Sequence, residues 1–364
     1  MNAMQEQLLS LLSHVLFDTP TAVTIGPETE AEAKSQAVST LIGTDYKTLS
    51  SNIRVINSHA ELTRVLAGIP FTTFKGYASA FYYPVPINRP MGDVDFIVAP
   101  EYYPAAVERL EGAGWEKLGF DHERHESFRK NKIEFELHTE IKGIPNGADG
   151  IVSDSETAEE KVRTLLADLI ETARAVQIQQ GTVIIPDDFH HGLIMLLHVA
   201  GHMLNDGGVG LRHICDWAVY CHRVDVERFR QQLESVGLWT FACQLTALCS
   251  KYLGLPEMDW VGEQDDGFLE ALMEDVLAAG NFGTKEAGRR TALEVKKTSF
   301  AEITKKRYPQ ASGIRLPLYM LINVFRYGRL LATGKRRAIK PSTFIGAKGR
   351  DELYSRFRLF EVKY

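Results

Sequence analysis

Apolar positions recur with two different periods along the chain, and the change of period divides it into three regions. Residues 1–68 are patterned as helices, residues 69–186 contain most of the short runs typical of strands, and the pattern from residue 187 onward is helical again. We therefore predict an α+β protein with a strand-rich domain at 69–186 and a mainly helical C-terminal domain at 187–364. The segment 1–68 is expected to pack on the strand-rich domain.

The strand-rich domain begins with a short β-prone run at residues 71–74, which breaks at Lys75-Gly76 into a helical stretch at 77–83. Residues 92–98 follow, with the apolar character of a buried strand. Further along, the pattern predicts helices at 101–112 and from about 153 to 173, and strands at 115–119, 127–130, 132–141 and 182–185.

Two carboxylates, Asp93 and Asp95, lie inside the run at 92–98. Because side chains alternate across a strand, both carboxylates point to the same face. Burying adjacent negative charges is costly without a counter-charge, and a divalent cation such as Mg²⁺ is the usual solution. A lone Asp-x-Asp is commonly a turn or a solvated strand face, but the apolar flank at 96–98 favours burial. We therefore predict that Asp93 and Asp95 bind metal.

The neighbours of this motif supply further candidate groups. Gly76 lets backbone N–H groups approach a phosphate where the strand gives way to the helix, and Lys75 adds a charge there, although a lysine at a strand end is often only solvated. A later alternating run places Glu134, Glu136 and His138 on one face. We select Glu136, in the middle of that run, as the third carboxylate. His138 is a candidate base, a support for the metal ligands, or a half-buried side chain with neither role.

Three motifs in this region resemble a known family. Lys75-Gly76, Tyr83-Pro84-x-Pro86-x-x-Arg89-Pro90-Met91-Gly92-Asp93-Val94-Asp95 and Glu136-Leu137-His138 are similar to motifs of a bacterial group of uncharacterised nucleotidyltransferases in the DNA polymerase β-like superfamily. The resemblance is specific over about residues 70–140 and weaker over about 187–225. It implies a mixed sheet flanked by helices. The superfamily often carries Gly-Ser after the first strand, where this chain has Lys75-Gly76-Tyr77, so Lys75 or backbone amides must replace the serine hydroxyl.

The resemblance also implies a reaction, a nucleoside triphosphate substrate and two Mg²⁺ ions, for which Mn²⁺ can substitute. The metal ligands and catalytic residues are then Asp93, Asp95 and Glu136, and the phosphate-binding residues are Lys75, Gly76 and Arg89. Arg89 can alternatively pair with Asp93. We predict an enzyme that moves a nucleoside monophosphate to a hydroxyl of a small molecule, a tRNA or a protein.

Two other classes of function remain open. A catalytically idle relative would bind nucleotide and act as a regulatory or scaffold protein. A phosphate-binding module would keep the same carboxylates for structural reasons alone. The intact set of carboxylates argues against the first of these.

A polar stripe follows one face of the first helix in the C-terminal domain. It comprises His191, His198, His202 and Asn205. His198 and His202 have the i, i+4 spacing of a metal site, but lack the intervening Glu of a zinc hydrolase. A metal site, a polar lining of the cleft, which we favour, and an ordinary helix flank all remain open. In the next helix, Arg212 is a further cleft candidate and is spaced to pair with Asp216.

Composition indicates a soluble globular protein, with 45% hydrophobic and 24% charged residues. The four cysteines lack a C-x-x-C pattern, so we interpret them as reduced core thiols. We find no signal peptide pattern and no apolar run of transmembrane length, and therefore predict a cytoplasmic protein.

The net charge of −6 conceals a basic segment at 315–350. This segment contains nine Lys or Arg residues and no Asp or Glu. Such a patch can attract RNA, DNA, an anionic membrane surface or another polyanionic acceptor. The apolar stretch at 316–331 fits a surface-lying membrane helix or, as we favour, a core-packing helix with a basic end. An arginine that reaches into the catalytic cleft is the third interpretation.

Overall fold

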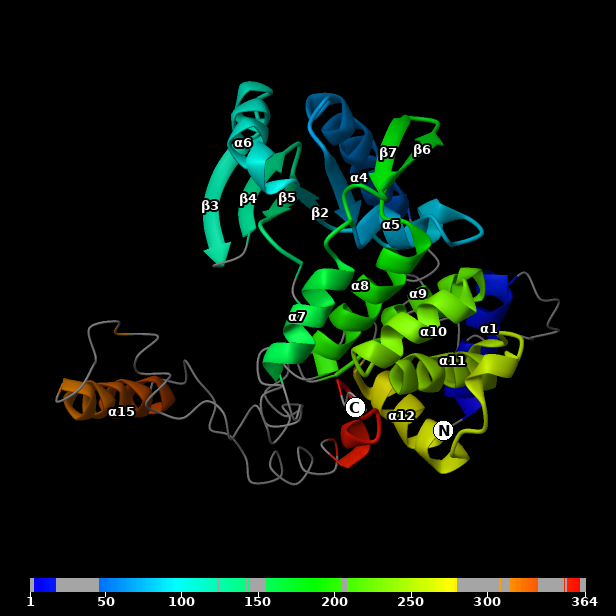
Figure 1. Ribbon diagram of the computed structural model, residues 1–364. Helices are drawn as coiled ribbons and strands as arrows, with labels where there is room; N and C mark the ends of the chain where they lie inside the picture. Colours follow the sequence, from blue (N-terminus) through cyan, green and yellow to red (C-terminus); the bar gives the residue numbers. More distant parts are fainter. Residues whose placement is uncertain are drawn as a thin grey trace.

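The computed structural model describes residues 3–17, 46–122, 125–141, 143–144, 155–203, 208–279, 308, 315–332, 350 and 352–360. They form a sheet with its own helices and, below it in Figure 1, a bundle of helices. Each part is built around a separate large hydrophobic core.

A mixed five-stranded sheet organises the first part. Its strands are β1 (Phe71–Phe74), β2 (Val94–Val98), β3 (Glu116–His122), β4 (His125–Lys130) and β5 (Ile133–His138), in the order β1-β2-β5-β4-β3. β2 and β5 run parallel, and the other neighbours are antiparallel. The predicted strands at 71–74, 92–98, 115–119, 127–130 and 132–141 all contribute to this sheet, which confirms the mixed architecture.

Helices and a hairpin cover the sheet. They are α4 (Tyr46–Val65), α5 (Gly76–Ala80), η1 (Pro86–Asn88), η2 (Pro100–Tyr102), α6 (Tyr103–Gly112), β6 (Arg174–Ile178) and β7 (Gly181–Ile185). The hairpin packs with β7 against α4 and β1. Strand β6 was not predicted. The helix predicted at 153–173 is present as α7, but it ends earlier, at Leu165. Phe96, Phe128 and Phe135 are fully buried between these layers.

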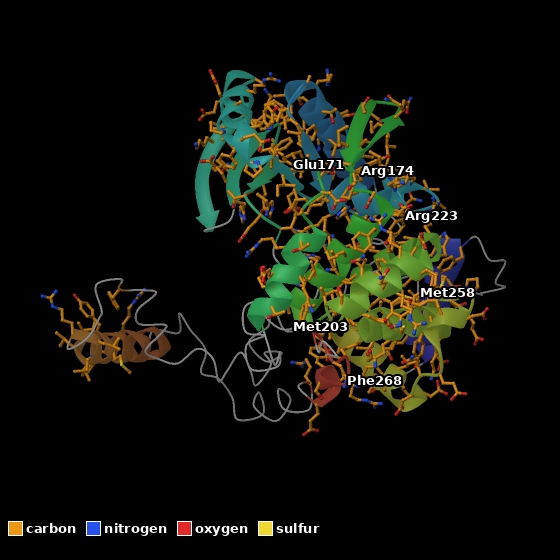
Figure 2. All side chains as sticks on the ribbon, in the orientation of Figure 1. Glu171, Arg174, Met203, Arg223, Met258 and Phe268 are labelled. Atoms are coloured by element: carbon orange, nitrogen blue, oxygen red, sulfur yellow. The ribbon has the colours of Figure 1, made fainter. Side chains whose placement is uncertain are left out.

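The second part is helical throughout. Its elements are α1 (Ala3–Phe17), α7 (Ser155–Leu165), α8 (Asp188–Gly201), α9 (Leu211–Tyr220), η5 (Cys221–Arg223), α10 (Val226–Ser235), α11 (Trp239–Leu253), η6 (Asp259–Val261) and α12 (Asp266–Ala279). The C-terminal residues return to this core, where the ring of Phe357 lies 4.9 Å from that of Phe241 and 5.3 Å from that of Phe268 (Figure 2). The four cysteines are buried here and free, as predicted.

The boundaries between the parts differ from the predicted ones at two helices. Within the segment 1–68, α4 packs on the sheet, but α1 lies against α9 and α11 of the helical part. Helix α7, inside the predicted strand-rich domain, also buries its apolar face in the helical core. Periodicity shows that a helix has an apolar face, but not which surface covers that face, so both assignments required the tertiary structure.

Tyr82 joins the two parts. Its hydroxyl donates to Asp188 at the start of α8 and accepts from Arg174 of β6 at 2.8 Å. The guanidinium of Arg223, from η5, lies 5.7 Å from the Tyr82 ring centre (Figure 2). The sheet and the helices are therefore tied together by polar contacts as well as by packing.

The basic segment is described in part. The predicted helix is present as α15 (Leu316–Ala332), and its side chains Leu318, Leu321, Ile322 and Phe325 are exposed. Arg350 lies 3.1 Å from Asp275 of α12, so this member of the basic set has a structural partner. The basic residues at 335–348 lie outside the described residues. Among the helices that the structure describes, none is long and apolar enough to cross a membrane.

Candidate functional site

Three carboxylates meet where β2 begins. Asp93 directly precedes β2 and Asp95 is its second residue, so the two share a face of the sheet. Across the parallel pair, Asp95 lies opposite Glu136 of β5. Parallel neighbours point the same way, so Glu136 joins the two aspartates, whereas Glu134 pairs with Arg129 further back along the strand.

Asp95 is the buried member of this set, with 2% of its surface exposed. Its Oδ1 accepts a hydrogen bond from Lys75 Nζ at 2.8 Å and lies 2.9 Å from His138 Nε2. Burial alone would raise the pKa of Asp95, but Lys75 and His138 outweigh it and hold the pKa well below its usual range. Desolvation in the site and the charges of Asp95 and Glu136 raise the pKa of Asp93.

Two histidines flank Glu136. His138 Nε2 lies 3.3 Å from one carboxylate oxygen of Glu136, and His125 Nε2 lies 3.8 Å from the other. Burial lowers the pKa of His138, but its contacts with Asp95 and Glu136 outweigh burial and raise it. The sheet thus gathers carboxylate oxygens and imidazole nitrogens, which are ligands that divalent cations use in proteins.

The turn between β1 and α5 positions Lys75. Its φ is 58° and that of Gly76 is 31°, a left-handed bend that directs the Lys75 ammonium to Asp95. A Cβ on Gly76 would lie 3.3 Å from Nε2 of the buried His59, so glycine suits this position sterically as well. Helix α5 is only five residues long, so its N-terminus offers less to a phosphate than the sequence suggested.

Arg89 forms a buried ion pair with Asp216 and not with Asp93. Its Nε and Nη2 donate to the two oxygens of Asp216, at 2.7 and 2.6 Å. Its Nη1 donates to the carbonyl of Gly76 at 3.0 Å, and the Tyr83 hydroxyl donates to Asp216 at 2.7 Å. With 4% of its surface exposed, Arg89 fastens the sheet's loops to α9. The predicted phosphate contact through Arg89 therefore has no support in this geometry.

Asn52 holds the loop that leads into β2. Its side-chain amide donates to the carbonyls of Ile87 and Arg89, and its oxygen accepts from the N–H of Met91. These three bonds fix the backbone just before Asp93. No local pattern indicates this role, because a lone Asn on an amphipathic helix is usually solvated.

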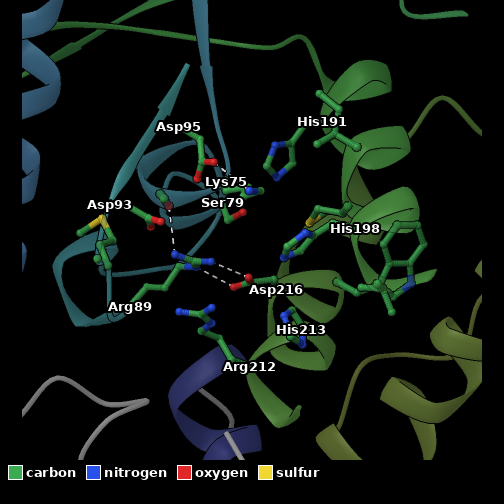
Figure 3. Close-up of a pocket in the computed structure, with 17 residues that line it drawn as sticks. Lys75, Ser79, Arg89, Asp93, Asp95, His191, His198, Arg212, His213 and Asp216 are labelled. Atoms are coloured by element: carbon green, nitrogen blue, oxygen red, sulfur yellow. Dashed lines mark hydrogen bonds and ion pairs between the residues drawn. The ribbon is translucent and has the colours of Figure 1, made fainter. Parts of the chain in front are cut away.

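These groups open onto a pocket of about 680 Å³, including its mouth, between the sheet and the helices (Figure 3). Lys75, Asp93 and Asp95 lie on the sheet side, opposite His191 and His198 of α8. Helix α9 completes the wall with Arg212, His213, Asp216 and Trp217. The pocket therefore combines the candidate metal ligands with cationic and imidazole groups from the helical part.

The predicted site residues are brought to this region from distant parts of the chain. The pocket is lined by Lys75, Gly76, Arg89, Asp93, Asp95, His191, His198 and Arg212. Glu136 and His138 lie beside Asp95 on the adjacent strand, and His202 contacts His198, with their Nε2 atoms 3.2 Å apart. His213 and Ser79 are pocket residues that the sequence did not single out. Asn205, a member of the predicted stripe, lies outside the described residues.

Comparison with known proteins gives three findings. A family model described as "Uncharacterised nucleotidyltransferase" matches residues 35–254, more than half of the chain. Among curated proteins, no sequence matches significantly. Of solved structures, one titled "Crystal structure of an antigenic nucleotidyltransferase-like protein from Paracoccidioides brasiliensis" covers 57% of this chain and 93% of its own, with 13% identity and a TM-score of 0.34. This structural likeness is too low to carry an argument. From the family match, the chain belongs to the uncharacterised nucleotidyltransferase family.

Proposed function

We propose that the protein is a metal-dependent nucleotidyltransferase that transfers a nucleoside monophosphate from a nucleoside triphosphate to a hydroxyl acceptor. One observation carries the proposal. The parallel register of β2 and β5 sets Asp95 beside Glu136, with Asp93 two positions away at the mouth of the pocket. Family membership supplies the reaction class, and this set of carboxylates supplies the groups that the reaction needs.

The donor set fits a pair of Mg²⁺ ions. Asp93, Asp95 and Glu136 offer hard oxygen ligands on one face of the sheet, and the raised pKa of Asp93 reflects their mutual repulsion as well as desolvation. When bound, the ions would supply charge stabilisation for the leaving pyrophosphate and would lower the pKa of the acceptor hydroxyl. Asp93, Asp95 and Glu136 are the residues that would hold the ions. Mn²⁺ is expected to substitute for Mg²⁺.

The remaining residues position substrate and protons. Lys75 Nζ fixes the orientation of Asp95 and places a positive charge at the pocket wall. Arg212 lines the opposite wall. It would bind phosphate oxygens, the role that the sequence analysis gave to Arg89. Glu136 would accept the proton of the acceptor hydroxyl. The Arg89–Asp216 pair keeps the two walls together while these groups act.

The test is transfer of label from α-³²P-labelled ATP, GTP, CTP and UTP in Mg²⁺ or Mn²⁺, with fractionated cell extract as the source of acceptors. Asp93→Asn and Glu136→Gln should each lower transfer by at least about a hundredfold, because each removes a charged ligand of the reacting metals. Glu134→Gln is the matched control, since it changes a carboxylate on the same strand that lies opposite Arg129 in the β4–β5 register.

Each result separates the candidate functions. Transfer by the wild type and by Glu134→Gln, but not by Asp93→Asn or Glu136→Gln, supports the proposal. It also identifies the base and the acceptor fraction. Triphosphate binding that depends on Mg²⁺, without transfer or pyrophosphate release in any fraction, points to an idle nucleotide-binding relative. Full transfer by Asp93→Asn would contradict the site assignment.

A further inference from the structure

Three histidines gather where α8 ends and α9 begins. His198 lies in the last turn of α8, His202 directly follows that helix, and His213 is in the first turn of α9. One ring nitrogen from each can be chosen so that all lie within 4.8 Å of one another. The ring centres of His198 and His202 are 4.5 Å apart, and those of His202 and His213 are 4.7 Å apart.

The spacing of the ring nitrogens in this cluster suits binding of one shared metal ion. The Nε2 atoms of His198 and His202 face each other at 3.2 Å. Two imidazole nitrogens bound at about 2.1 Å to one metal are about 3.4 Å apart in a tetrahedral site and about 3.0 Å apart in an octahedral one. The observed separation lies between these values, so both nitrogens can reach one ion with little movement.

One member of the cluster, His213, has an unsatisfied ring nitrogen. His213 has 5% of its surface exposed, and its Nε2 is buried with no hydrogen-bond partner among the described residues. Burial holds the pKa of both His198 and His213 well below the usual range. A buried ring nitrogen without a partner is costly, and a bound metal ion would give this nitrogen a partner.

We infer that His198, His202 and His213 bind a divalent transition metal of the Zn²⁺ class. Imidazole nitrogens suit Zn²⁺, Co²⁺ and Ni²⁺, in contrast to the oxygen ligands on the sheet, which suit Mg²⁺. The site is therefore separate from the carboxylate site and does not depend on the proposed transfer reaction.

Binding through Nε2 of His213 requires a local change. Nδ1 of this ring now accepts the N–H of Gly210 at 3.1 Å. Metal binding at Nε2 moves the ring proton to Nδ1, which then needs an acceptor. Rotation of the peptide between Val209 and Gly210 would present the Val209 carbonyl to the Nδ1–H of His213. A hydrogen bond of this kind usually orients a metal-bound histidine. Glycine at 210 eases this rotation, because the rotation changes the φ of residue 210.

Three protein ligands leave a coordination position for a further group, as in zinc sites that bind water or substrate. His198 and His213 also line the pocket that contains Asp93 and Asp95. The fourth ligand is therefore water or an oxygen atom of whatever occupies the pocket.

The test is Co²⁺ binding by the full chain carrying Asp93→Asn and Asp95→Asn, which weakens the carboxylate site. Visible absorption of Co²⁺ and metal content after gel filtration report on binding without any need for activity. One Co²⁺ per chain is expected, with displacement by Zn²⁺. His202→Gln should weaken binding by more than about tenfold, because loss of an outer contact to a ligand alone costs about that much. His222→Gln, at an exposed histidine of η5, is the matched control.

Two results would overturn the inference, and neither depends on a single variant. Absence of Co²⁺ and Zn²⁺ binding by the chain with intact histidines overturns the inference, whether or not the variants fold. Equal binding by His202→Gln, His213→Gln and the His222→Gln control overturns it as well, with circular dichroism used to confirm folding. Zn²⁺ should also raise the melting temperature of the chain with intact histidines and not that of His202→Gln.

Discussion

Replacing Asp216 with Asn tests the buried ion pair that fastens the sheet to α9. Asp216 accepts two hydrogen bonds from Arg89 and one from Tyr83, and Arg89 is 4% exposed. The variant keeps the volume but leaves the Arg89 guanidinium buried without its counter-charge. Removing one partner of such a pair costs about 3–5 kcal/mol. We expect the melting temperature to fall by about 5–10 °C for a protein of this size.

The assay is urea and thermal unfolding followed by circular dichroism, with a double-mutant cycle that adds Arg89→Met. The double variant should be more stable than the sum of the single losses predicts, by at least about 1 kcal/mol, because it buries no unpaired charge. Arg230→Met, which breaks an exposed i, i+4 pair with Glu234, should cost less than about 1 kcal/mol. A loss below 1 kcal/mol in Asp216→Asn, or strict additivity in the cycle, would refute the reasoning.

The same pair gives a pH dependence. Burial acts to raise the pKa of Asp216, but Arg89 outweighs it, so the folded-state pKa is lowered. A carboxylate with a lowered pKa contributes stability that is present above its unfolded pKa, about 3.9, and is lost as the pH falls through the folded value. The stability difference between wild type and Asp216→Asn should therefore be full at neutral pH and shrink below about pH 4.

Three further predictions concern other parts of the molecule. Gly76→Ala should lower the free energy of urea unfolding by more than about 1 kcal/mol and weaken triphosphate binding, because φ is 31° at this position and the His59 imidazole lies beside it. Gly112→Ala is the control and should have neither effect, because there is open space around Gly112. Burial lowers the pKa of His190, but its contacts with Asp187 raise it overall, so the advantage of wild type over His190→Gln should be full below about pH 6.5 and decline at higher pH in thermal melts. Phe357→Ala should cost about 3–5 kcal/mol in chemical unfolding, since this ring is fully buried in the helical core.

The pocket lies between two sets of functional groups, one on the sheet and one on the helices. Carboxylate oxygens come from Asp93 and Asp95 of the sheet, and imidazoles and a guanidinium come from α8 and α9. Motions that separate the sheet from the helices would disperse these groups, and the contacts of Arg89 and Tyr82 oppose such motions. Weakening those contacts is therefore expected to affect substrate binding as well as stability.

The sequence by itself determined the elements whose signals are local. Alternation fixed the faces of β2 and β5, and therefore that Asp93 and Asp95 point one way and that Glu136 shares a face with His138. Two charged residues in an otherwise buried strand indicate a function, which is why a candidate site could be predicted before the structure. The helices of the C-terminal part could likewise be predicted, because burial of one helix face makes apolar residues recur at the helical period.

The tertiary structure alone decided which of these faces meet. No local signal states that Arg89 pairs with Asp216 rather than Asp93, that α1 and α7 belong to the helical core, or that His213 completes a cluster with His198 and His202. Such contacts join residues far apart in the chain, and they form where shape, charge and buried area are jointly satisfied. Periodicity describes one element at a time, so it cannot specify partners that are chosen by packing the whole chain.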